Sequence, residues 1–220
     1  MTAGSDGAGG DDLAALFADV LDGRYPPVDG GFHVVEPDRT TGQHAVLAFT
    51  GHAVLATDRP REQLAGLGLD GYGRAHHPDV LRALAGPHGW IGVLDAMLVT
   101  CGTGVGGTSL RRTRDLDDHH RVVYARETRV AVEVLADERG LVTVGRGLGG
   151  RRELGFELTG APSGLREGQA LLRDVLAELP AGEPVWAACA PGNARSLRTL
   201  LAVGFVAVGA EVLLQPAARG

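Results

Sequence analysis

Hydrophobic positions in the first part of the chain follow the spacing of short helices and strands. Between 13 and 21, apolar side chains recur every three or four residues, as on one face of an amphipathic helix. The proline pair at 26–27 ends this helix, because proline cannot continue one. The pattern then predicts strands over 44–49 and 53–57 and short helices near 60–67 and 78–85.

The second half is patterned more clearly. Alternating valines predict a strand near 128–136 with a hairpin partner over 141–144. The stretch 153–158 predicts a third strand, with an apolar face on one side and Glu153 and Glu157 on the other. The other predicted elements are a strand over 93–101, a glycine-rich loop over 103–108, a helix around 115–127, a helix over 165–179, a strand over 185–190, a helix from Asn193 with Leu197, Leu200 and Leu201 inward, and a final strand over 205–214.

The order of these elements indicates the fold class. From residue 92 it is strand, helix, three strands, helix, strand, helix, strand. Three meandering strands followed by alternating helices and strands make a mixed sheet. We therefore predict an α/β fold with a mixed, mostly antiparallel sheet flanked by helices, preceded by an α/β extension over 11–91.

Composition fits a folded globular protein and excludes several classes of function. Of 220 residues, 44% are hydrophobic and 22% charged, and the formal net charge is −6. This charge disfavours a nucleic-acid partner, which would need a clustered basic face, and fits cationic or neutral small molecules better. The sequence has no uninterrupted apolar window of membrane-spanning length, and its start does not resemble a signal peptide. We expect no membrane association and a cytoplasmic location.

Two residue types limit the chemistry. Cys101 and Cys189 are far apart in the sequence, and in the cytoplasm we expect two reduced, buried thiols rather than a disulfide. All 21 basic residues are arginine. The absence of lysine excludes a lysine Schiff base and a Walker-type phosphate site, because both need an amine.

Two weaker patterns point elsewhere. GxGxxG occurs at 102–107 and at 145–150, but neither is followed by the apolar helix that a dinucleotide site needs. Adjacent histidines occur at 76–77 and 119–120, and adjacent side chains diverge in a helix or strand. With no HExxH or paired-cysteine motif present, we expect capping or solvated histidines and no metal site.

The most informative segment is 183–214. Asn193, the only asparagine, follows Pro191-Gly192, where a strand must end and a helix begin. Asparagine is a good helix N-cap, so a purely structural role is one interpretation. The segment continues with Ser196-Leu197, Gly204-Phe205 and an apolar strand carrying Gly209 and Glu211.

This pattern resembles the C-terminal part of the GCN5-related N-acetyltransferase (GNAT) superfamily. There an asparagine opens the last helix, a small residue follows three positions on, and Gly-Phe begins the next strand. The resemblance implies a GNAT-like domain over 92–214, after a disordered tail (1–10) and the extension (11–91), and before a second tail (215–220). It also implies acetyl-CoA or another acyl-CoA as co-substrate and an amine of a small molecule or peptide as acceptor, and it leaves a homodimer open.

In this superfamily a strand, loop and helix hold the CoA diphosphate, with backbone N–H groups at a helix N-terminus. The family motif is Arg or Gln, two residues, Gly, one residue, then Gly or Ala. Here these positions are Ser163, Arg166 and Gly168, so only Gly168 fits. The side chain of Arg166 stands where glycine lets the backbone approach the phosphate: it either clashes with the phosphate or contacts it directly through its guanidinium. The acyl-CoA-binding residues implied by the resemblance are Leu158, Thr159, Ser163, Gly164, Leu165, Arg166, Glu167, Gly168, Asn193 and Ser196.

Catalytic groups are less clearly indicated. Many members of the superfamily place a tyrosine seven residues after the helix-opening asparagine, to protonate the leaving thiolate, and Leu200 occupies that position. Glu153 and Glu157 are the candidate general bases; either one needs burial to bring its pKa toward neutrality, and otherwise both are solvated carboxylates. Two hypotheses remain: an acyl-CoA-dependent N-acyltransferase, and a catalytically inactive GNAT-like ligand-binding or interaction module.

Overall fold

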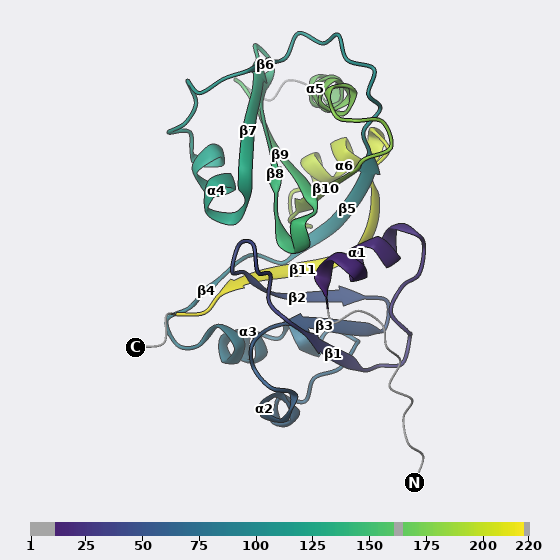
Figure 1. Cartoon of the computed structure of the whole chain (residues 1–220), viewed down its shortest axis with the longest axis vertical. Helices are drawn as coiled ribbons and strands as arrows, with labels where there is room; N and C mark the ends of the chain where they lie inside the picture. Colours follow the sequence, from purple (N-terminus) through teal and green to yellow (C-terminus); the bar gives the residue numbers. More distant parts are fainter. Residues whose placement is uncertain (1–11, 161–164, 218–220) are drawn as a thin grey trace.

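A computed structural model describes residues 12–160 and 165–217 as two lobes stacked along the long axis (Figure 1). The predicted tail over 1–10 lies outside these residues. The lower lobe contains β1 (Phe32–Val35), β2 (His44–Phe49), β3 (His52–Ala56), α2 (Arg61–Leu64), α3 (Pro78–Ala85) and β4 (Trp90–Ile91), and α1 (Leu13–Leu21) lies where the lobes meet. The upper lobe contains β5 (Asp95–Cys101), β6 (Arg111–Arg112), α4 (His120–Thr128), β7 (Val130–Asp137), β8 (Gly140–Arg146), β9 (Arg152–Leu158), α5 (Leu165–Glu178), β10 (Pro184–Cys189) and α6 (Ala194–Ala202).

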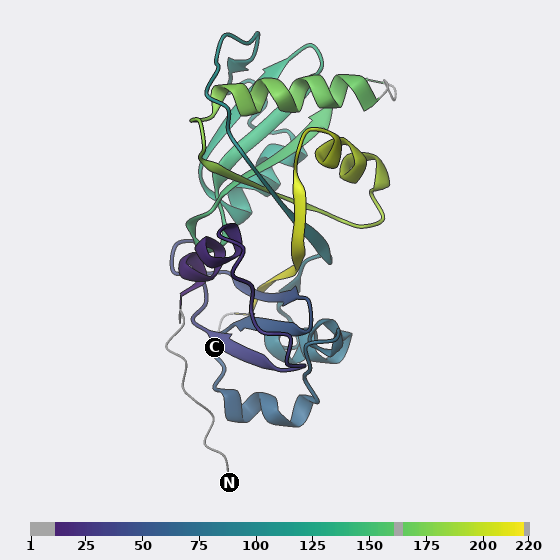
Figure 2. The same ribbon diagram turned by 90° about the vertical axis from the view of Figure 1, so that its right-hand side faces the viewer.

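One sheet of 11 strands runs through both lobes, in the order β1-β3-β2-β11-β5-β10-β9-β8-β7-β6, with β4 paired to the end of β11 (Val206–Gln215). The pairs β1–β3 and β9–β10 are parallel, and the others are antiparallel. The predicted α/β class with a mixed, mostly antiparallel sheet flanked by helices is confirmed. β11 pairs first with β5 and then with β2, so it carries the sheet from one lobe into the other (Figure 2).

The two parallel strands of the upper lobe part soon after they meet. β9 and β10 are paired at Glu153–Trp186 and Leu154–Ala187. Beyond this point β9 continues its pairing with β8 alone, and β10 continues with β5 alone. Backbone N–H and C=O groups on the facing edges are therefore left open to a ligand.

Helices cover both faces of the upper sheet, with α4 on one side and α5 and α6 on the other (Figure 1). The apolar stripe of α5 packs with Leu154, Val185 and Leu200 into one buried cluster. On the opposite face, Val122 of α4 packs on Val134 and Leu141. Alternate residues of β9 therefore face different layers, with Leu154 toward α5 and Glu153 toward the α4 side.

Two sequence motifs have structural roles. His119 and His77 are helix N-caps, and their side chains accept hydrogen bonds from the backbone N–H groups of Arg121 and Asp79. The expected capping role is therefore confirmed for these two histidines. The glycine-rich loop at 102–107 lies over the end of α5, where the N–H groups of Thr103 and Gly104 donate to carbonyls in the last turns. This first GxGxxG match is a helix cap.

Three local predictions are corrected. α4 begins at His120 rather than near 115, because His119 caps it and the residues before it form turns. Both cysteines are free, but Cys101 is exposed at the end of β5, and only Cys189 is buried. Leu201 is 47% exposed and does not face inward, whereas Leu200 is buried. Within the described ranges, no helix combines the length and apolar character needed to cross a membrane.

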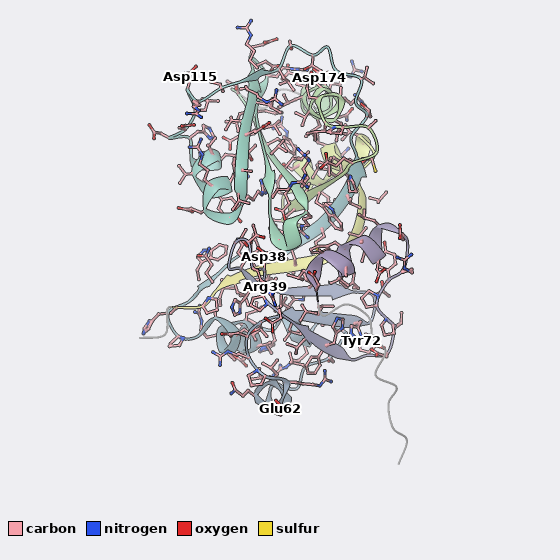
Figure 3. All side chains as sticks on the ribbon, in the orientation of Figure 1. Asp38, Arg39, Glu62, Tyr72, Asp115 and Asp174 are labelled. Atoms are coloured by element: carbon pink, nitrogen blue, oxygen red, sulfur yellow. The ribbon has the colours of Figure 1, made fainter. Side chains whose placement is uncertain are left out.

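The lobes are joined by polar contacts as well as by β11. Asp38 and Arg39 lie at the junction, between Glu62 at the lower end and Asp174 at the upper end (Figure 3). The Asp38 carboxylate is buried and accepts a hydrogen bond from the Gly149 N–H in the turn between β8 and β9, at 3.0 Å. α1 contributes Phe17, which packs on Trp186 of β10 with ring centroids 5.0 Å apart.

Candidate functional site

A cavity of about 400 Å³ lies where β9 and β10 part. Its walls include Leu154, Cys189 and Leu200 from the α5–α6 side of the sheet, and Tyr124 and Glu153 from the α4 side. The cavity therefore passes through the sheet at the separated strands. A long ligand that enters from one face can meet a second ligand that enters from the other.

A buried cluster of charged residues forms the floor of this cavity on the α4 side. Arg151 donates to both carboxylate oxygens of Glu211 at 2.7 Å and to Glu153 at 2.6 Å. Arg129 donates to the second oxygen of Glu153 at 2.9 Å. The fifth member of the cluster, Asp95, lies directly opposite Glu211 on the neighbouring strand. The cluster thus has three carboxyl groups and two guanidinium groups.

Asp95 is the member without a guanidinium partner among the described residues, and it lines the cavity. Burial, with repulsion from Glu211 and Glu153, raises the pKa of Asp95 to about 6. Burial also raises the pKa of Glu211, in spite of its ion pair with Arg151. A carboxyl group with a pKa near neutrality, at the surface of a cavity, is suited to proton transfer.

The sequence left two roles open for Glu153, a solvated carboxylate or a general base, and its surroundings favour neither. It is 4% exposed and lines the cavity floor. Burial opposes its ionisation, but the ion pairs with Arg151 and Arg129 outweigh this effect and lower the pKa of Glu153. A carboxylate held ionised by two arginines is a poor proton acceptor near neutral pH.

Glu157 lies two residues further along the same face of β9, beside the mouth of the cavity. Its oxygens lie 3.0 Å from His120 Nε2, 3.8 Å from His119 Nε2 and 3.5 Å from Arg121 Nε. His119, His120 and Glu157 could together hold a metal ion. However, His119 Nδ1 accepts from a backbone N–H, which leaves the imidazole proton on Nε2, and Arg121 brings a positive charge to the same carboxylate.

Tyr124 lines the cavity from the α4 wall. Burial and the neighbouring Asp95 raise the pKa of Tyr124 above its ordinary value, so its phenol stays protonated. Leu200, in the position where the family resemblance expects a tyrosine, is an apolar part of the opposite wall. The cavity therefore contains a phenol that comes from a different helix.

Those predicted acyl-CoA-binding residues that the structure describes lie on the α5–α6 side of the parted strands. Ser163 and Gly164 lie outside the described residues, as does the side chain of Leu165. Arg166 and Glu167 are exposed in the first turn of α5. Gly168 is buried, and a Cβ there would come within 3.0 Å of Thr199 Cγ2, so this glycine lets α5 pack closely on α6.

The remaining predicted positions differ in whether they are free to contact a ligand. Leu158 packs in the cluster under α5, and the backbone N–H of Thr159 already donates to the Arg139 carbonyl at 2.9 Å. That amide is not available to a ligand. Asn193 and Ser196 line the cavity at the start of α6, where the Asn193 side chain accepts from the Ser196 N–H at 3.2 Å. Asn193 is therefore both an N-cap and a wall residue.

Replacing Asn193 with alanine tests its capping role. We expect Asn193→Ala to lower the free energy of unfolding by about 1 kcal/mol, because the Ser196 N–H loses its acceptor. Urea unfolding measures this change. Asn193→Asp keeps the capping oxygen and should restore most of the loss; equal stability of the alanine variant and the original chain would refute the role.

No family model and no curated protein matches the sequence. A crystal structure described as a candidate acetyltransferase of the GNAT family, from Novosphingobium aromaticivorans, is similar with a TM-score of 0.41 and 12% identity, covering 60% of this chain and 69% of that one. A protein of unknown function from Staphylococcus epidermidis is similar with a TM-score of 0.37 and 14% identity, covering 63% and 66%.

Several groups at the site were not among the candidates indicated by the sequence: Asp95, Arg121, Tyr124, Arg129, Arg151 and Glu211. Asp95 carries a signal, because it is a carboxylate inside a strand that otherwise reads as buried. Tyr124 and Arg129 lie in a helix and a strand that the sequence predicts, and Arg151 lies just before a predicted strand. These local patterns do not indicate that the three side chains gather at one site.

Proposed function

We propose that the chain is an acyl-CoA-dependent N-acyltransferase. The observation that supports this proposal best is the cavity that crosses the sheet between the parted strands β9 and β10. The open backbone edges of these strands suit the amides of an extended carrier arm, and the start of α5 suits its diphosphate. The acceptor amine enters from the α4 side.

Asp95 acts as the general base. An ammonium group next to it loses a proton to the carboxylate, and the free amine attacks the thioester carbonyl carbon. The C–S bond breaks as the C–N bond forms, and backbone N–H groups at the parted strands stabilise the oxyanion. Tyr124 donates its proton to the leaving thiolate and regains one from the amide nitrogen. The proton held by Asp95 passes to solvent, so that an amide, a free thiol and one proton result.

Acyl-CoA binding is the first test. With acetyl-CoA at a hundred times its dissociation constant, the fold should gain about 2.7 kcal/mol. For a chain of this length that corresponds to a rise in Tm of about 5–10 °C. Arg166→Glu should reduce this shift because it places a negative charge beside the diphosphate, whereas Arg173→Glu, further along α5 and also exposed, should not.

Two outcomes would contradict the proposal. The absence of a thermal shift with acetyl-CoA and with longer acyl-CoAs would refute binding. A shift without release of thiol for any amine would favour the catalytically inactive module instead.

A further inference from the structure

The charged groups on the cavity wall separate into two ends. Asp95, which has no guanidinium partner among the described residues, forms an acidic end where β5 meets β11, whereas Glu211 and Glu153 beside it are paired with Arg151 and Arg129. His120 and Arg121 form a basic end in the first turn of α4. The N-terminus of a helix carries partial positive charge and α4 has no acidic residue in its first turn, so the helix adds to the basic end.

Arg121 is held more weakly than the other arginines of the site. Its Nε lies 3.5 Å from Glu157 and has no hydrogen-bond partner among the described residues, although this atom is buried. Its side chain is 38% exposed, so the guanidinium can turn toward the cavity. Arg129 and Arg151, by contrast, donate directly to carboxylates at 2.9 and 2.6 Å.

Glu157 by itself does not form hydrogen bonds with every donor at the basic end. One carboxylate faces two imidazoles and a guanidinium, and the buried Nε of Arg121 makes no hydrogen bond with it. A planar, bidentate acceptor is the group that a guanidinium recognises best. A ligand carboxylate at the mouth would therefore find donors ready for it.

The size of the cavity limits the ligand. Asp95, Tyr124 and Arg121 all line it, so a single small ligand can contact both ends. The cavity volume of about 400 Å³ admits a small molecule or the end of a chain.

We propose that the acceptor is a small amino carboxylate, with its ammonium group at Asp95 and its carboxylate at Arg121. This inference rests on the proposed function, since it names the substrate class of the same site. A diamine would bring a second positive charge toward Arg121 and His120. The N-terminal residue of a peptide would present an uncharged amide there, so the site discriminates free amino acids from peptide ends.

Matched acceptors test this inference. Glycine, β-alanine and γ-aminobutyrate are compared with their carboxamides, which keep the amine and the shape but remove the negative charge. Calorimetry in the presence of CoA measures binding, and thiol release from acetyl-CoA measures turnover. We expect at least one acid to be favoured about ten- to a hundredfold over its carboxamide, the range for a charge-assisted hydrogen bond.

Two variants of α4 locate the effect. Arg121→Gln should abolish the preference for acids. Arg126→Gln, an exposed arginine of the same helix that pairs with Asp117 outside the cavity, should retain it. Equal or tighter binding of the carboxamides, or the same preference in both variants, would overturn the inference. Acylation of carboxamides with no preference for acids would overturn the substrate class alone, whereas failure of every acyl-CoA to bind would refute the proposed function.

Discussion

Asp95→Asn is expected to lower acyl transfer by about a hundredfold or more, and at the same time to stabilise the folded protein above pH 6. Asparagine cannot accept the ammonium proton, and a positioned general base contributes about 10²–10⁴-fold to the rate. In the unmodified chain the rate should rise with pH through about 6, the pKa of Asp95, because only the ionised carboxylate is a base. Steady-state kinetics from about pH 5 to 8 measures both effects.

The stability effect follows from the same group. The pKa of Asp95 is about 6 in the fold, against 3.8 in a free side chain, so between these values the folded state holds a proton that the unfolded state has released. The contribution of Asp95 to stability is therefore lost as pH rises through this window. Asparagine does not ionise, so Asp95→Asn avoids this loss. Urea unfolding at about pH 5 and about pH 8 should show that the free energy of unfolding of the variant exceeds that of the original chain by more at the higher pH.

A matched control is Asp117→Asn, an exposed carboxylate whose pair with Arg126 should contribute about 0–1 kcal/mol. It should leave both the rate and the pH dependence of stability unchanged. If Asp95→Asn retains full activity with acetyl-CoA and an accepted amine, Asp95 is not the base. A pH-independent stability difference would show that Asp95 ionises normally in the fold.

Arg151→Met is expected to lower the free energy of unfolding by about 3–5 kcal/mol. The guanidinium is fully buried, donates to Glu211 and Glu153, and lies 4.6 Å from the Phe17 ring centroid. Methionine fills a similar volume but leaves Glu211 buried without its partner. Because domains are stable by only about 5–15 kcal/mol, this is a large share of the total.

Two further variants keep this prediction testable if Arg151→Met does not fold. Adding Glu211→Leu removes the orphaned carboxyl group and should recover much of the loss. Arg146→Met, which breaks the half-exposed ion pair with Glu183, should change stability by about 0–1 kcal/mol. Denaturant unfolding compares the three, and equal losses for Arg146→Met and Arg151→Met would show that buried charge is not the cause.

The sequence predicts most of the regular elements of secondary structure, but not which distant side chains come together at the site. The spacing of apolar residues placed α1, α3 and α5 within a few residues of their observed bounds, since each helix buries one face. α4 was placed too early because its start depends on a histidine cap rather than on an apolar stripe. Glu153 and Glu157 were correctly assigned to one face of β9, but the pattern held no information on the arginines that hold Glu153 ionised.

What the sequence by itself determined is the order of the longer strands and helices, the absence of lysine chemistry, and the segment around Asn193 that resembles GNAT proteins, because these depend on residue type and local spacing. The two-residue strands β4 and β6 were not predicted. Tertiary structure decided the site. β9 and β10 part only in three dimensions, and Asp95 of β5, Tyr124 of α4 and Arg151, which precedes β9, come together only in the fold. Their protonation depends on burial and on neighbours distant in the chain, which local sequence does not encode.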